Sequence, residues 1–253
     1  MSRRRFYAPS AAFAPNGKSL TLSAEETRHV RDVLRLQRGG EIYVFDGEGR
    51  EYNCIIAEIN RESARLDLIK QVEPESPESP LQLRLALALL KNEKVDLVVQ
   101  KATELGVVRV IPVITARADI RIRDGEDARR RVTRWKRIAL EAVKQCGRAR
   151  LVEINEPVTF DSLIDEPGQD KEPRVMFAER AGTSFAKFSS SLSSRPASLI
   201  ALVGPEGGWT DEEIARARDA EWNIVTLGGR TLRAETAAIV VTALLQHRFG
   251  DLV

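Results

Sequence analysis

A regular run of prolines divides the sequence into two parts. Pro74, Pro77 and Pro80 stand at every third position among small and acidic residues. Because proline fixes φ and offers no backbone N–H, this run favours an extended, polyproline-like segment and excludes a helix or a central strand. The chain of 253 residues is long enough for two domains with their own cores. We therefore expect a first domain at 1–73, a linker at 74–80 and a second domain at 81–253.

The first part has the pattern of a small β-barrel or sheet. Short segments rich in β-forming residues alternate with polar turns, at Lys18–Leu22, Glu41–Asp46, Glu51–Ile59 and Ser63–Ile69. One helix is expected between them, because Ser23 and Glu26 have the spacing of a capping box and Gly39 and Gly40 end the pattern. Its apolar stripe consists of Thr27, Val30, Val33 and Leu34.

The opposite face of this predicted helix is basic. Arginines at helical spacing would form one ridge that suits contacts with phosphates, made of Arg28, Arg31, Arg35 and Arg38. The run Arg3-Arg4-Arg5 favours the same interpretation. A solvated helix face is the alternative.

The second part alternates apolar strands with amphipathic helices, which is typical of an α/β domain with a mostly parallel sheet. The predicted strands are Leu81–Leu89, Val107–Ile114, Val152–Ile154, Arg174–Ala178, Ser198–Val203 and Asn223–Leu227. The predicted helices include one that Asn92 caps and Gly106 ends, a long one at Arg129–Cys146, and an apolar one from about Ala234 to Arg248.

Composition narrows the class of protein. The segment Arg117–Arg150 holds twelve Lys and Arg against five Asp and Glu, which indicates a polyanionic partner unless the segment is a solvated face. The apolar runs are too short to span a bilayer and the N-terminus lacks a signal core, so we expect a cytoplasmic protein without membrane contact. Cys54 and Cys146 have neither the spacing of a zinc site nor that of a disulfide framework.

Two glycine-rich loops carry the strongest functional signal. Strand Ser198–Val203 runs into Gly204-Pro205-Glu206-Gly207-Gly208, and Thr210 with Glu213 then forms a capping box that opens a helix. A second loop, Leu227–Arg233, follows the next predicted strand. Backbone N–H groups are bare where a strand gives way to a helix, so both loops suit one pocket that could hold an adenosine. A tight turn without a ligand is the alternative, whereas the glycine spacing of a dinucleotide site is missing.

Several ordered motifs lie along nearly the whole chain. They are Arg28-His29-Val30, Val33-Leu34-Arg35, Gln100–Val107, Glu141-Ala142, Gln145–Arg148, Gly204–Gly208 and Leu227–Ala237. Together they resemble the 16S ribosomal RNA uracil-N3 methyltransferase family. The resemblance implies a PUA-like β-barrel that binds RNA, followed by a SPOUT α/β domain with a deep trefoil knot. It also implies a homodimer, S-adenosylmethionine without a metal as cofactor, and 16S ribosomal RNA in the small ribosomal subunit as partner.

The expected site residues follow from the loops and from this resemblance. The cofactor is expected at Leu202, Gly204, Pro205, Glu206, Gly207, Gly208, Leu227, Gly228, Arg230, Leu232 and Thr236. RNA is expected at Arg3, Arg4, Arg5, Arg28, Arg31, Arg35, Lys101, Arg117, Arg134, Arg137 and Arg148. The family pattern has a threonine where this sequence has Ala234, so no role of a hydroxyl carries over to that position.

Methylation of uracil N3 requires a weakly acidic imide proton to leave and needs no covalent intermediate. Arg233 suits stabilisation of the deprotonated uracil, while Glu235 or Glu206 could anchor that arginine or accept the proton. Cys146 would be needed only for methylation at C5, and its place on an apolar stripe favours a core residue. The main alternative function is a non-catalytic RNA-binding or ribosome-assembly factor, which would not bind S-adenosylmethionine. A nicotinamide-dependent oxidoreductase is disfavoured, because the sequence lacks the glycine motif of a dinucleotide site.

Overall fold

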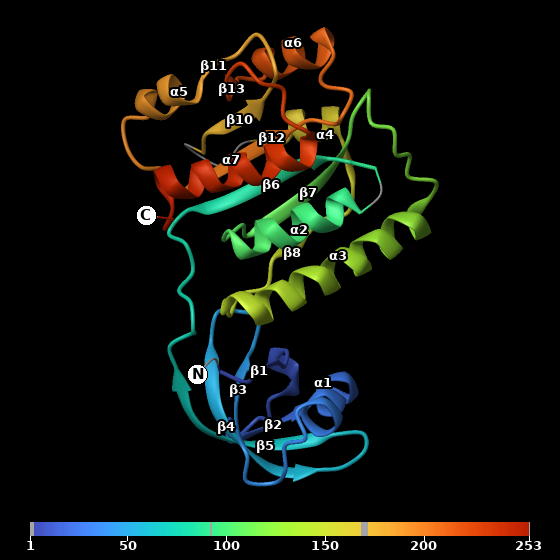
Figure 1. Cartoon of the computed structure of the whole chain (residues 1–253), viewed down its shortest axis with the longest axis vertical. Coiled ribbons are helices and arrows are strands. Elements are labelled where there is room, and N and C mark those ends of the chain that lie inside the picture. The colour runs from blue at the N-terminus through green and yellow to red at the C-terminus, as the bar shows by residue number, and fades with distance from the viewer. Residues whose placement is uncertain (1–2, 92, 168–171, 253) are drawn as a thin grey trace. The chain divides into compact units, whose positions relative to one another are not determined.

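The computed structural model describes residues 3–91, 93–167 and 172–252 (Figure 1). The predicted helix cap Asn92 lies outside these ranges. The chain forms two compact units, which are described separately. The first unit contains the residues up to Glu78 together with Val143–Leu151, and the second contains Ser79–Ala142 and the residues from Val152 onward.

Among its described residues, the first unit has a five-stranded sheet in the order β1-β3-β4-β5-β2. The strands are β1 (Arg5–Tyr7), β2 (Ser19–Leu22), β3 (Glu41–Phe45), β4 (Glu51–Ile59) and β5 (Ala64–Val72). β1 pairs with β3 in parallel, and the other neighbours are antiparallel. Each strand contributes to one core, which includes Phe6, Leu20, Ile42, Ile56 and Leu66. The four predicted strands are confirmed to within a few residues, and β1 adds a strand that the arginine-rich N-terminus did not signal.

The start of the predicted helix is confirmed. Ser23 Oγ accepts a hydrogen bond from Glu26 N at 3.2 Å and caps α1 (Ala24–Arg28). The Glu26 carboxylate is buried and forms an ion pair with Lys144. The carboxylate that was predicted to complete the cap instead pairs with the segment Val143–Leu151 of this unit.

The prediction of an arginine ridge was wrong, because the helix ends before it can carry all four arginines. α1 passes directly into a π-turn, η2 (His29–Val33). The chain then leaves the helical path at Arg35, which has a left-handed φ of 51°. Leu36 N donates to Val30 O at 3.0 Å, and Leu36 packs against the barrel core. Burial of Leu36 outweighs continuation of the helix, so Arg28, Arg31, Arg35 and Arg38 do not share one helical face.

Among its described residues, the second unit has a parallel sheet of eight strands. Their order is β11-β13-β10-β12-β6-β7-β8, with β9 beside β7. The strands are β6 (Gln82–Ala88), β7 (Arg109–Ile114), β8 (Glu153–Ile154), β9 (Val158–Thr159), β10 (Arg174–Phe177), β11 (Thr183–Ser184), β12 (Ser198–Val203) and β13 (Asn223–Thr226). This confirms the predicted α/β class and the six predicted strands of this part.

Helices cover both faces of this sheet, so its central strands are buried on both sides. The helices are α2 (Lys94–Glu104), α3 (Gly125–Cys146), α4 (Phe160–Asp165), α5 (Phe185–Ser191), α6 (Asp211–Asp219) and α7 (Ala234–Phe249). Residues of α2, α3, α5 and α7 share one core with Leu83, Leu85 and Leu87 of β6. Residues of α4 and α6 share the other core with Ile200 and Leu202 of β12.

The helix α3 has the predicted amphipathic form. Val132, Trp135, Ala139 and Ala142 are buried, and Arg130, Arg134 and Arg137 are exposed. Its last turn, from Val143, belongs to the first unit. Every helix in the described part of the chain is too short or too polar to cross a membrane.

Candidate functional site

A cavity of about 650 Å³ lies in the second unit, where β10, β12 and β13 end. The carboxyl ends of parallel strands are the usual place for a ligand, because loops diverge there and leave backbone groups accessible. Its wall consists of Phe177–Glu179, Val203–Trp209 and Leu227–Ala234, with Lys94 and Ala237. The two glycine-rich loops predicted to share a pocket do therefore meet.

Most of the residues predicted to contact the cofactor line this cavity. They are Gly204, Pro205, Glu206, Gly207, Gly208, Leu227, Gly228, Arg230 and Leu232. Leu202 lies in the core shared with α4 and α6, and Thr236 is an exposed residue of α7 outside the cavity wall. These two residues do not fit the predicted contacts. Lys94, Phe177 and Glu179 line the cavity without having been predicted.

Trp209 packs against the first glycine-rich loop and fixes its position. Its indole Nε1 donates to Phe177 O at 2.8 Å in a buried position. A Cβ atom at Gly204 would lie 2.8 Å from Trp209 Cε2, so glycine is required for this close approach. Beyond Trp209, the predicted capping box is confirmed, since Thr210 Oγ1 accepts from Glu213 N at 3.1 Å and Glu213 Oε2 accepts from Thr210 N at 2.9 Å.

Arg117 also holds this loop, although it was predicted to contact RNA. Its Nη1 donates to Gly207 O at 3.3 Å and to Trp209 O at 3.2 Å. A Cβ atom at Gly207 would lie 3.0 Å from Arg117 Cβ, so the two residues are in direct contact. Arg117 is exposed and uses only Nη1 for these bonds, so its predicted contact with RNA stays a prediction.

Lys94 is the charged group that links the two sides of the cavity. Its Nζ lies 3.2 Å from Glu206 Oε1 and 3.4 Å from Glu235 Oε2. The hydrogen bond to Glu206 raises the pKa of Lys94 above its ordinary value, and Glu235 adds to this rise. The ammonium of Lys94 therefore stays charged. It pairs with Glu206 and Glu235, the two carboxylates that had been predicted to anchor Arg233.

Arg233 is the N-cap residue of α7. Its exposed side chain lines the cavity and forms no ion pair within the described ranges. Both the guanidinium and the cavity are therefore open to the same incoming group.

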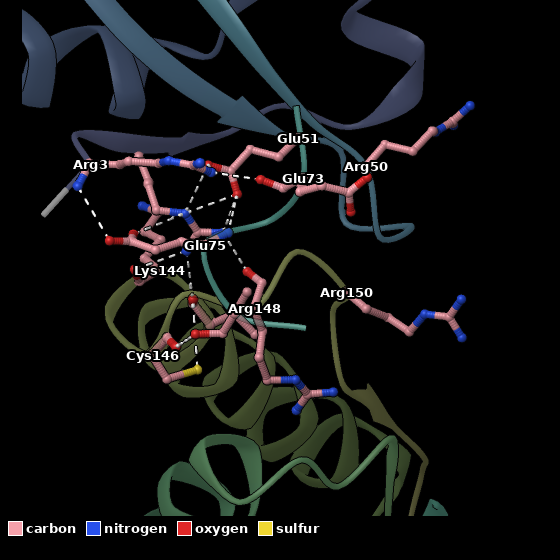
Figure 2. A network of polar contacts seen from close by, with 12 residues as sticks. Arg3, Arg50, Glu51, Glu73, Glu75, Lys144, Cys146, Arg148 and Arg150 are labelled. Carbon is pink, nitrogen blue, oxygen red and sulfur yellow. Dashed lines mark hydrogen bonds and ion pairs between the residues drawn. The ribbon is translucent and has the colours of Figure 1, made fainter. Parts of the chain in front are cut away.

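Two of the predicted RNA contacts, Arg5 and Arg148, are buried in the first unit. Arg148 belongs to the network of polar contacts drawn in Figure 2. Arg5 forms an ion pair with Glu51 at 3.0 Å and donates to the carbonyls of Val143 and Arg148, at 3.1 and 2.6 Å. Arg148 itself is 3% exposed and pairs with Glu78. Because these guanidinium groups are shielded and already paired, they do not fit contacts with phosphate. Arg3 pairs with Glu51 as well, at 3.1 Å.

The remaining predicted RNA contacts lie on the surface. Arg31 pairs with Asp32, Lys101 with Glu104, and Arg134 with Asp96. Others are exposed and form no ion pair with any residue that the structure describes, namely Arg4, Arg28, Arg35 and Arg137. In the same part of the chain, no three His, Cys, Asp or Glu side chains are grouped so as to hold a metal ion.

Comparison with known proteins gives the family. The model of an RNA methyltransferase domain matches residues 77–246, and that of an RNA methyltransferase PUA domain matches residues 22–69. The chain belongs to the RNA methyltransferase family. The barrel of the first unit thus corresponds to the PUA domain of this family, and the cavity lies in its methyltransferase domain.

Relatives in this RNA methyltransferase family match almost end to end. The Ribosomal RNA small subunit methyltransferase E of Rickettsia conorii is 30% identical, over 98% of this chain and 96% of its own. The enzyme of the same name from Bacillus subtilis is 29% identical, over 91% and 90%.

Solved structures agree with these matches. A Legionella pneumophila protein described as a methyltransferase and solved with bound cofactor SAM is 32% identical, with a TM-score of 0.88 over 100% of both chains. A Ribosomal RNA small subunit methyltransferase E from Neisseria gonorrhoeae, bound to S-adenosyl methionine, is 27% identical with a TM-score of 0.87 over 100% of both.

Proposed function

We propose that this chain methylates N3 of a uridine in 16S ribosomal RNA of the small ribosomal subunit, with S-adenosylmethionine as methyl donor. The observation that carries the proposal is the cavity between the two glycine-rich loops, in a chain that matches a SAM-bound structure over its whole length. The names of the relatives support small-subunit ribosomal RNA as the substrate. The specificity for N3 of uracil rests on the family resemblance.

The cavity fits S-adenosylmethionine in size and lining. Pockets for ligands of this size enclose roughly 300–1,000 Å³, which includes the 650 Å³ found here. A Cβ atom at Gly228 or Gly229 would meet nothing within 4 Å, so the backbone there faces open space. Leu227 and Leu232 offer apolar surface to an adenine ring, and the loop backbones offer donors and acceptors. When bound, the cofactor supplies an electrophilic methyl group.

The residues of the chain then align the uracil and manage its proton. Arg233 is free to donate to a uracil oxygen, where its fixed charge stabilises the ring after N3 loses its proton. Glu206 is occupied by Lys94 and by the backbone of Lys91, and therefore suits an anchor of the loop. Glu235, which has fewer partners, is the better candidate for the proton acceptor.

The remaining assignments follow from this proposal. We assign RNA contacts to the exposed residues Arg4, Arg28, Arg35 and Arg137 and to the partly exposed Arg31, because they present charge to solvent. The functional division at 1–73, 74–80 and 81–253, the trefoil knot, the homodimer and the cytoplasmic location are part of the same proposal. A ribosomal substrate in bacteria supports the location.

The test combines product mapping with two variants. Purified protein, small subunits and labelled S-adenosylmethionine should give N3-methyluridine at one position, identified by mass spectrometry of the ribosomal RNA. Arg233→Ala should lower kcat by roughly a hundredfold or more at unchanged cofactor affinity, as expected for loss of a charge-stabilising donor. Cys146→Ser should keep the wild-type rate, because Cys146 does not line the cavity. RNA binding without any affinity for S-adenosylmethionine would instead identify a non-catalytic factor.

A further inference from the structure

Lys94 lies where its charge is unfavourable for its own helix. It is the first residue of α2, and the N-terminus of a helix carries the positive end of the helix dipole. Cations are stabilised at the opposite end. A lysine at this position therefore needs compensation from outside the helix.

Two carboxylates from different segments provide that compensation. Glu206 belongs to the first glycine-rich loop, and Glu235 is the second residue of α7. The side chains of Lys94, Glu206 and Glu235 are 28%, 23% and 13% exposed, so water screens their charges only partly. One ammonium thus joins two walls of the cavity.

The two carboxylates differ in what holds them. Glu206 Oε1 accepts a second hydrogen bond, from the backbone N–H of Lys91 at 3.2 Å. Apart from its ion pair with Lys94, the buried Glu235 Oε2 has no polar partner among the residues that the structure describes. Burial favours the protonated form of a carboxyl group, and a neighbouring cation opposes this effect. The position of the Glu235 carboxylate therefore depends on Lys94 more than that of Glu206 does.

We infer that Lys94 is a positioning residue: it holds the Glu235 carboxylate in place on the cavity wall, where that carboxylate accepts the N3 proton of the target uracil. This inference rests on the proposed function. In the step, the N3–H bond breaks, its electron pair stays on the ring, and the proton forms an O–H bond with Glu235. The proton later passes to water. Arg233, two positions earlier, faces the oxygen on which negative charge gathers.

Other charged side chains lie near Lys94 and Glu235, and a test must separate their effects from that of this pair. Glu179, Arg230 and Arg233 line the same cavity. The ammonium of Lys91 lies three residues from Lys94 in the chain, but it pairs with Asp119 at 2.6 Å. Lys91→Met therefore removes a nearby positive charge without touching the contact with Glu235, and it serves as the matched control.

The decisive measurement is the pH dependence of kcat/KM. In Lys94→Met the pKa of Glu235 should rise, because the cation that favoured the carboxylate is gone. The acid limb of the profile should move upward by about one pH unit or more. At a pH below both limbs the rate should fall about tenfold or more, and it should recover at high pH. Lys94→Arg and Lys91→Met should both keep the limb of the wild type.

A second measurement does not depend on turnover. Carbon-13 NMR of labelled glutamate side chains, with Glu235→Gln to identify the signal, should show the same upward shift of the Glu235 titration in Lys94→Met. Calorimetry with S-adenosylmethionine checks that each variant still binds the cofactor.

The outcomes separate the inference from the function. A slower Lys94→Met enzyme that keeps both the wild-type acid limb and the wild-type titration of Glu235 would overturn the inference. So would a further shift of the limb when Lys94→Met is added to Glu235→Gln, since the responsible carboxylate would then be another one. A wild-type protein that methylates no uracil would instead overturn the proposed function.

Discussion

Gly229 is the residue at which the cavity can be probed with least disturbance to the fold. It lines the cavity, its φ lies outside the left-handed region, and an added Cβ would meet nothing within 4 Å. Gly229→Val should therefore fill part of the cavity and weaken binding of S-adenosylmethionine at least tenfold, which corresponds to about 1.4 kcal/mol. Calorimetry measures the affinity, and thermal unfolding should show an unchanged midpoint.

The choice of glycine matters for this experiment. Gly207→Val would press against Arg117, and Gly228 has a φ of 125° that disfavours any side chain. Loss of affinity in those variants would mix backbone strain with blocked space. Full cofactor affinity in Gly229→Val would show that the ligand lies elsewhere.

Residues of the site could be predicted only where neighbours in the sequence reveal them. Gly204–Gly208 stand between a strand and a capped helix, so the end of the strand and the helix cap identify the loop in the sequence. Lys94 and Arg117 come from other segments, and in the sequence each resembles an ordinary surface charge. One signal was present, since a lysine just after a predicted helix start lies at the wrong end of the helix dipole.

Among helices and strands, the pattern of apolar residues predicted the bounds reliably where burial alone determines the structure. β4 and β12 have the predicted bounds, because alternating or continuous apolar residues specify them. The end of α1 depends instead on Leu36 reaching the core, and β1 depends on neutralisation of Arg5 by Glu51, far away in the sequence. Such tertiary contacts leave no local periodicity.

Because Arg5 forms an ion pair with Glu51, its replacement should lower the free energy of unfolding far more than replacement of the adjacent Arg4. Arg5→Ala leaves Glu51, which is 0% exposed, without its closest cation and removes donors from three carbonyls. Breaking a buried pair costs about 3–5 kcal/mol. Arg4→Ala changes an exposed residue and should cost less than about 0.5 kcal/mol. Urea unfolding of the two variants measures both, and equal losses would contradict the assigned role of Arg5.

At the scale of the whole molecule, the last helix predicts self-association. Val241 and Leu245 of α7 are buried within the second unit and are therefore not available to an interface. Ile239, Val240 and Leu244 are half-buried and remain available. Light scattering at micromolar concentration should give twice the chain mass of 28.2 kDa. Val240→Asp should lower it toward one chain without unfolding, whereas a monomeric wild type would refute the dimer.

The first unit is completed by residues that are synthesised long after its strands. Arg5 finds the carbonyls of Val143 and Arg148, and Leu151 N donates to Gly47 O at 2.9 Å. During translation the strands leave the ribosome while 79–142 are still to be made. At about 5–20 residues per second this delay lasts roughly 3–13 seconds. The barrel can therefore be completed only after residues 79–151 have been made, although its strands are encoded first, and a fragment that stops at the proline run would lack the pieces that close it.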